Sequence, residues 1–191
     1  YFYKKNIIIS ANFLRLGLPR FNLSQFINLF KEIIIPKNIA IQTFSEFKCR
    51  DNRIFSRFNT EVTKNLSSLS KFAFKSFPEK RILSPTHSFI FLDDNKELYN
   101  YIFQSAFGKD SIFSYLLKND YYWLNLGSYL YETCTFMHHI ESMNYNLIPY
   151  RENIILPVKV FKDRKETKFD LINYEYFAKK NKYLNSKFNW L

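Results

Sequence analysis

The chain has 191 residues, of which 47% are hydrophobic and 20% aromatic, and this composition excludes a disordered protein and allows one domain with a sizeable core. The formal net charge of +11 indicates an anionic partner, but Lys and Arg are scattered from Lys4 to Lys187 rather than clustered, so a small phosphate-bearing ligand is favoured over nucleic acid. No apolar run approaches the roughly 20 residues that a membrane helix needs, so we expect no membrane partner.

Two cysteines, Cys49 and Cys134, are far apart in the sequence and predict neither a disulfide framework nor a metal site. The apolar run Ile7–Ile9 follows Lys4 and Lys5, and it is too short for the hydrophobic region of a secretory signal. We therefore interpret the chain as a reduced, cytoplasmic protein.

Strands and helices alternate through the first half of the chain. Phe26, Leu29, Phe30 and Ile33 repeat at helical spacing, and Pro36 predicts the end of that helix. A polar loop is expected over residues 44–65. The predicted elements are a buried strand over Lys5–Ser10, a helix over Asn22–Ile35, a buried strand over Ile39–Thr43 and a helix over Ser67–Phe77.

The second half continues the alternation. A capping box, Asp94-x-x-Glu97, predicts a helix that runs to about Phe107, with Gly108 as its stop signal. The remaining expectations are a short apolar run over Phe89–Phe91, a helix over Ile112–Lys118 capped by Asp110 or Ser111, strands over Tyr121–Leu126 and Ile154–Phe161, and a mixed, basic tail from Glu166. This alternation predicts a layered α/β fold, with residues 1–191 forming a single domain.

The segment Thr135-x-x-His138-x-x-Glu141 carries the pattern most typical of chemistry. Thr135 is expected to be a helix N-cap whose hydroxyl accepts a backbone N–H. His138 and Glu141 are three residues apart and share one helix face, while His139 points elsewhere. An imidazole beside a carboxylate can take a proton from a nucleophile, because the carboxylate favours the imidazolium that forms. Taken alone, such a pair is more often structural or on the surface.

Seven short blocks, in order, resemble the aminoglycoside 3-N-acetyltransferase (antibiotic N-acetyltransferase) family over about Ile7 to Arg151. The resemblance implies an α/β/α sandwich around a central mixed sheet, unrelated to the GNAT acetyltransferases, with acetyl-CoA as co-substrate and an amine of an amino sugar as acceptor. No matching block follows about residue 152, so we expect the C-terminal part of this acetyltransferase-like domain to be divergent or truncated. The blocks are Ser10-x-Asn12 with Leu16-Gly17, Ile41-Gln42-Thr43-Phe44-Ser45, Arg81-x-x-Ser84-Pro85-Thr86-His87-Ser88-Phe89, Phe107-Gly108-x-x-Ser111, Leu126-Gly127, Thr135-x-x-His138-x-x-Glu141 and Pro149-Tyr150-Arg151.

The resemblance assigns roles to these positions. His138 would be the general base, Glu141 would orient it, and the Thr135 hydroxyl would lie near the thioester. His87 and Ser88 would contact the pantetheine arm of coenzyme A or shape its channel. Alternatives remain open, since Thr135 and Ser111 can be ordinary helix caps, His87-Ser88 a turn, and Arg81 a solvated surface residue. The other cofactor-binding candidates are Ser111 near the pyrophosphate, Arg81 as a counter-charge, and Asn12 and Thr43 along the channel.

Charge bears on the acceptor. A polycationic aminoglycoside favours a pocket rich in carboxylates, whereas this chain has 17 acidic against 28 basic residues. We therefore expect a neutral or anionic amino sugar as the small-molecule acceptor. A degenerate, non-catalytic relative that binds coenzyme A or a sugar remains the alternative, and a nucleic-acid-binding protein is a third. Whether the chain forms a homodimer stays open.

Overall fold

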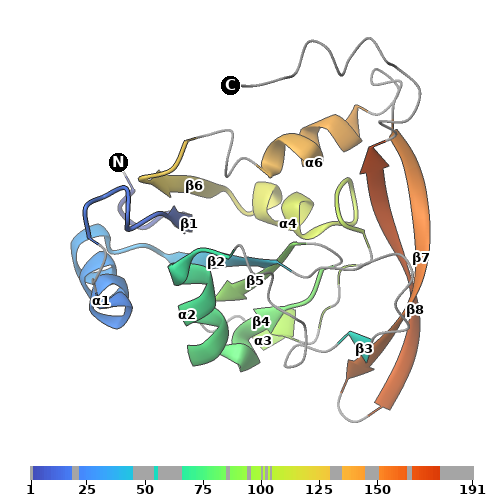
Figure 1. Ribbon diagram of the computed structural model, residues 1–191, viewed down its shortest axis with the longest axis horizontal. Coiled ribbons are helices and arrows are strands. Elements are labelled where there is room, and N and C mark those ends of the chain that lie inside the picture. Colours follow the sequence, from blue (N-terminus) through green and yellow to red (C-terminus); the bar gives the residue numbers. More distant parts are fainter. Residues whose placement is uncertain are drawn as a thin grey trace.

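The computed structural model describes residues 2–18, 22–44, 54–55, 66–84, 87–93, 96–99, 101, 103, 105–129, 135–144, 151–162 and 165–176 (Figure 1). The order of elements in these segments is β1 (Asn6–Ala11), α1 (Leu23–Ile34), β2 (Asn38–Phe44), β3 (Ile54–Phe55), α2 (Ser68–Ser76), η1 (Pro78–Lys80), β4 (Arg81–Ile82), β5 (His87–Phe91), α3 (Lys96–Tyr99), α4 (Ile112–Lys118), β6 (Tyr121–Leu126), α6 (Phe136–Met143), β7 (Arg151–Lys162) and β8 (Lys165–Tyr176).

The central sheet has five strands in the order β4-β5-β2-β1-β6. β1 pairs in parallel with β2 and with β6, so that Ile7 lies between Ile39 and Tyr122. β5 is antiparallel to both of its neighbours. The predicted mixed sheet is therefore confirmed. Because β1, β2 and β6 are parallel, their carboxyl ends share one edge of the sheet, and β5 begins at that same edge.

Helices cover both faces of this sheet, as the alternation of side chains along the buried strands requires. On one face, Ile7 and Ile9 belong to a core cluster with residues of α1 and α2. On the other face, Ile8 and Ala40 belong to a cluster with residues of α4. Figure 1 shows α1 and α2 on one side of the sheet and α4 and α6 on the other. The fold is thus the α/β/α sandwich that was predicted.

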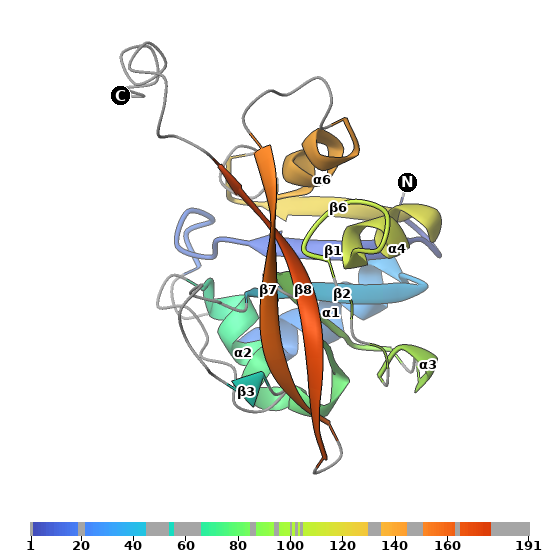
Figure 2. The same ribbon diagram turned by 90° about the vertical axis from the view of Figure 1, so that its right-hand side faces the viewer.

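A second sheet has the order β3-β7-β8. β7 and β8 form a long antiparallel hairpin, and the short β3 pairs in parallel with β7. Figure 2 shows the hairpin crossing the direction of the central strands, on the side of the sheet where α4 and α6 lie. The sequence predicted part of β7 as a strand but not β8, and β3 lies inside the expected 44–65 loop.

The helix predicted to open at the Asp94 capping box does not continue to Phe107, and Asp94 itself lies outside the described residues. Among the described residues of this stretch the helix is α3, which spans four residues, and Phe103 donates its N–H to the carbonyl of Leu83 instead of to a preceding helical turn. Ser105 forms an isolated parallel β-bridge with Ser111. Phe103, Ala106 and Phe107 are buried, but the tertiary hydrogen bond of Phe103 replaces the helical one.

Helical spacing also misplaced the buried face of α1. The spacing predicted that Leu29 and Ile33 would face the core, yet their side chains are 46% and 72% exposed. Ile27 and Phe30 are buried instead. Asn22 caps the helix by accepting two backbone N–H groups, and Ile35 ends it in the left-handed conformation. The predicted boundaries of this helix are confirmed.

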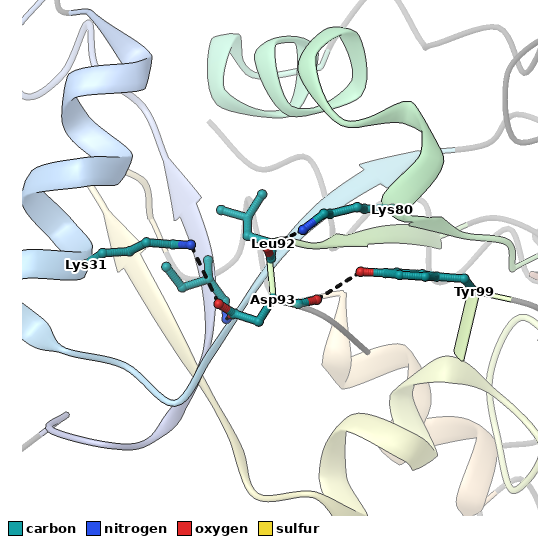
Figure 3. A network of polar contacts seen from close by, with 6 residues as sticks. Lys31, Lys80, Leu92, Asp93 and Tyr99 are labelled. Carbon is teal, nitrogen blue, oxygen red and sulfur yellow. Dashed lines mark hydrogen bonds and ion pairs between the residues drawn. The ribbon is translucent and has the colours of Figure 1, made fainter. Parts of the chain in front are cut away.

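The amino end of β2 is held to the end of β5 by Asp93. Its Oδ2 accepts the N–H of Ile39 at 2.6 Å, and its Oδ1 lies 3.6 Å from Lys31 Nζ on α1. Figure 3 shows Tyr99 reaching the same residue from the other side, where its hydroxyl donates to the Asp93 carbonyl at 2.9 Å. Lys80 Nζ donates to the carbonyl of Leu92, the residue before Asp93. This network fixes both helical layers at the sheet edge opposite the carboxyl ends of β1 and β2.

Gly127 lets the chain leave β6 directly beside the end of β1. Its φ is +68°, and an added Cβ would lie 2.7 Å from the backbone oxygen of Asn12 and 2.7 Å from Leu16 Cγ. Gly127→Ala is therefore expected to lower the free energy of unfolding by about 2–4 kcal/mol, as the sum of left-handed strain and overpacking. Denaturant unfolding measures this loss.

Gly17 is the matched control for that substitution. Its φ is +73°, but an added Cβ there meets nothing within 4 Å. Gly17→Ala should therefore cost only the conformational strain, about 1–2 kcal/mol. Equal losses in the two variants would contradict the close approach at Gly127.

Candidate active site

Three polar residues lie buried together where β2, β4 and β5 meet. Thr43 on β2 is paired with Ser88 on β5, and its hydroxyl donates to the Ser88 carbonyl at 3.3 Å. Arg81 Nε donates to the same Thr43 hydroxyl at 3.2 Å. The Arg81 guanidinium also lies over the ring of Phe74, with 4.9 Å to the centroid. This cluster connects three strands of the sheet from the inside.

Arg81 is not the surface residue that is usual for arginine. Its exposed fraction is 0%, and burial lowers the pKa of its guanidinium to about 9. A side chain without exposed surface does not contact a phosphate in this conformation. The geometry therefore favours a role for Arg81 in holding the strands, and a contact with coenzyme A stays a prediction.

His87 opens β5 at the same edge. Its ring lies 5.2 Å from the ring of Phe107 and 5.6 Å from that of Phe113, measured between centroids. Burial, and to a smaller extent the nearby His138, lowers the pKa of His87 to about 3. His87 is therefore neutral at ordinary pH and lies close enough to His138 for the two to interact electrostatically.

His138 and Glu141 lie on one face of α6, as predicted. His138 Nδ1 is 2.9 Å from Glu141 Oε2, and the two side chains are 42% and 28% exposed. A carboxylate accepts only, so Nδ1 carries the proton in this pair and Nε2 holds the lone pair. The ring of Phe107 packs edge-on against His138 at 5.7 Å. A half-exposed imidazole with this tautomer can accept a proton from a bound amine.

Thr135 precedes α6, but the predicted capping hydrogen bond is absent. Its backbone is helical, with φ −58° and ψ −22°, so its side chain makes no cap contact, and only its carbonyl accepts the N–H of His138. The Thr135 hydroxyl instead accepts from Gln42 Nε2 at 3.3 Å. The capping interpretation is therefore wrong, because the Thr135 hydroxyl contacts Gln42 on β2 instead of a backbone N–H of its own helix.

Two of the predicted cofactor-binding residues, Ser111 and Asn12, form hydrogen bonds with neighbouring residues of the chain. Ser111 is completely buried and caps α4 by accepting the N–H of Ser114, while its hydroxyl donates to the carbonyl of Gly108 at 2.7 Å. Asn12, partly exposed after β1, accepts the N–H of Arg15 at 3.3 Å. The capping alternative for Ser111 is thus what the structure shows, while cofactor contacts by Ser111 and Asn12 stay predictions.

Sequence reasoning missed two residues that line this region. Gln42 and Phe107 both lie in quoted sequence blocks, but nothing in a single sequence shows that Gln42 contacts Thr135 or that Phe107 packs against both His87 and His138. A polar residue inside an apolar strand was the available signal for Gln42, since buried polar groups are generally hydrogen-bonded.

No protein-family model and no curated protein matches the sequence. Among solved structures, AAC-IIIb in a binary complex with CoASH has a TM-score of 0.68 at 17% identity, over 92% of this chain and 70% of that chain. Aminoglycoside acetyltransferase AAC(3)-Xa has a TM-score of 0.68 at 10% identity, over 94% of this chain and 68% of that chain. Sisomicin-bound AAC-VIa has a TM-score of 0.69 at 11% identity, over 91% and 70%. The chain has the aminoglycoside acetyltransferase fold.

This acetyltransferase fold bears out the resemblance seen in the sequence blocks. Its likeness to those structures extends over nine tenths of the chain, beyond the last block at Arg151. Among the described residues, no helix is long and apolar enough to cross a membrane. The same segments contain no group of three or more His, Cys, Asp or Glu residues that could hold a metal ion.

Proposed function

We propose that the chain is an acetyl-CoA-dependent N-acyltransferase that acylates an amino group of a sugar-like acceptor by direct transfer. The observation that carries this proposal is the 2.9 Å contact between His138 Nδ1 and Glu141 Oε2 in a chain with the aminoglycoside acetyltransferase fold. Support for the co-substrate comes from AAC-IIIb, which binds CoASH, and from the net charge of +11, which favours an anionic ligand.

His138 Nε2 is the proposed proton acceptor. As the amine attacks the thioester carbonyl, a C–N bond forms and the amine proton passes to Nε2, while Glu141 stabilises the imidazolium. The C–S bond then breaks, and the imidazolium returns the proton to the leaving thiolate. The site therefore ends the cycle in its starting protonation state, with an amide and a free thiol as products.

Thr135 is the proposed donor to the developing oxyanion. Its hydroxyl oxygen already accepts from Gln42, which directs its own proton away from that side chain. A hydroxyl oriented in this way is suited to stabilise negative charge on the thioester oxygen.

The six predicted cofactor residues divide by exposure. Thr43, Ser88, Arg81 and Ser111 are buried, whereas His87 and Asn12 are partly exposed. We infer that His87 and Asn12 are the ones positioned for direct contact with coenzyme A, and that the buried four support the channel wall. On this account residues 1–191 belong to one acyltransferase domain, and the reduced, cytoplasmic setting expected from the two cysteines is part of the same proposal.

The proposed acceptor is a neutral or anionic amino sugar. AAC-VIa has been solved with sisomicin. This chain, however, has 28 basic and 17 acidic residues, and a basic balance disfavours the binding of a polycation. A thiol-release assay with acetyl-CoA tests this by comparing neutral and anionic amino sugars with kanamycin-type polycations. We expect faster release with the first group, and fast turnover of the polycations would contradict the charge argument.

The same assay separates the alternative. A degenerate relative would bind acetyl-CoA or a sugar and release no thiol with any acceptor. Its strongest structural support is that four of the six predicted cofactor residues are buried.

A further inference from the structure

Helix α6 reverses the usual distribution of apolar and polar side chains. Its buried residues are His139 and Ser142, while Met137, Ile140 and Met143 are 51%, 43% and 54% exposed. A helix on a globular protein normally buries its aliphatic residues, because their transfer from water is favourable. The buried imidazole of His139, with an exposed fraction of 2%, therefore needs a reason other than hydrophobic burial.

The His139 imidazole is a hydrogen-bond acceptor. Its Nδ1 accepts the N–H of Gly108 at 3.1 Å. Ser111 Oγ lies 3.4 Å from the same nitrogen, but its proton goes to the Gly108 carbonyl at 2.7 Å. Nδ1 is therefore unprotonated and Nε2 carries the hydrogen. Burial lowers the pKa of His139, which keeps this acceptor neutral.

Aromatic rings hold the imidazole in this orientation. The His139 ring stacks on Phe113 of α4 with 6.0 Å between centroids and an interplanar angle of 29°. It also lies 5.3 Å from the ring of Phe136. The side chain thus joins α6 to α4 by packing and to the Gly108 turn by a hydrogen bond.

The Gly108 amide is connected to the candidate base through the neighbouring residue Phe107. Gly108 has φ +84°, a left-handed conformation that favours glycine, and Phe107 is the residue before it. The ring of Phe107 packs against His138 at 5.7 Å and against His87 at 5.2 Å. A displacement of the Gly108 amide therefore moves the wall against which the His138 ring rests.

We propose that His139 is a positioning residue for the His138–Glu141 pair. By accepting the Gly108 N–H, it fixes α6 and Phe107 relative to each other, and so fixes the direction of the His138 ring. The expected consequence for turnover rests on the proposed acyltransferase function, whereas the hydrogen bond itself does not.

Two substitutions separate the acceptor from the ring. His139→Phe keeps an aromatic ring and removes the acceptor, whereas His139→Asn removes the ring and places Oδ1 near the position of Nδ1. We expect His139→Phe to lower kcat for thiol release by about 10–100-fold with the KM for acetyl-CoA within about twofold, because small misplacement of a catalytic group is costly. His139→Asn should keep kcat within about threefold of the unsubstituted chain.

A loss of packing alone would give the opposite order, with the ring-retaining variant more active. That order, or an unchanged kcat in His139→Phe, would overturn the proposal. Should His139→Phe not fold, His139→Asn decides the matter by itself, because a loss of about tenfold or more in its kcat would also overturn the proposal.

Amide hydrogen exchange, followed by NMR, tests the proposal without any turnover. The Gly108 amide should be protected in the unsubstituted chain and in His139→Asn, and should lose protection in His139→Phe. If the unsubstituted chain releases no thiol with any acceptor, the acyltransferase proposal fails, and this exchange measurement still decides whether His139 holds the Gly108 turn. Equal protection of Gly108 in both variants would contradict the positioning role.

Discussion

His138→Ala is expected to lower the turnover of amine-dependent thiol release by about 10²–10⁴-fold, which is the range for loss of a general base. The reason is that His138 accepts the amine proton in the proposed transfer, and the nearby His87 is a poor substitute because burial lowers its pKa to about 3. Binding of acetyl-CoA should remain within about twofold, because His138 acts on the amine. Steady-state kinetics together with calorimetric binding measure the two effects separately.

Two companion variants sharpen that result. Glu141→Gln keeps an oxygen that can accept from His138 Nδ1 but removes the charge that stabilises the imidazolium, so its kcat should fall less than that of His138→Ala. Met137→Ala, at a half-exposed position of the same helix, should change kcat by less than about twofold. Turnover that survives His138→Ala would show that His138 is not the base.

Acidification below pH 6.5 is expected to destabilise the fold through His87. Burial lowers the pKa of this imidazole in the folded chain to about 3, compared with 6.5 when unfolded. The unfolded chain therefore binds more protons in this range, so stability is complete above pH 6.5 and is lost progressively as the pH falls towards 3. His139, whose pKa is also lowered, acts in the same direction.

The size of this effect follows from linkage. Each unit of pKa difference corresponds to about 1.4 kcal/mol, so His87 alone should cost about 2 kcal/mol between pH 6.5 and pH 5. Because His87 is partly exposed to solvent, this is an upper value. Chemical denaturation at pH 8, 6.5 and 5 measures the slope, and His87→Phe should flatten it between pH 6.5 and 5. An unchanged slope in that variant would contradict the burial of a neutral His87.

The sequence predicted the layers of the fold because they depend on short-range patterns. Buried apolar runs gave β1 and β2, and the order of strands and helices indicated an α/β sandwich with a mixed sheet. The pairing of His138 with Glu141 was predictable too, since residues three apart on a helix are neighbours. These features follow from spacing along the chain.

Features that depend on distant segments were not predictable. The hydroxyl of Thr135 contacts Gln42, 93 positions away, instead of capping its own helix. The helix expected up to Phe107 gave way to a hydrogen bond between Phe103 and Leu83. His139 was set aside as pointing elsewhere, which is correct, but its contact with the Gly108 amide needs the folded chain. In the first two cases a tertiary hydrogen bond overrode a local pattern, and in the third it added a contact that the local pattern does not show.

Acyl transfer by this chain is tested most simply by the amine-dependent release of thiol from acetyl-CoA, measured for the unsubstituted chain with a panel of amino sugars and with mass spectrometry of the acceptor. We expect thiol release that requires the amine, and an acceptor that gains one acetyl group for each thiol released. Tight binding of acetyl-CoA with neither thiol release nor acetylated acceptor, for every acceptor in the panel, would show that the chain is not an acyltransferase.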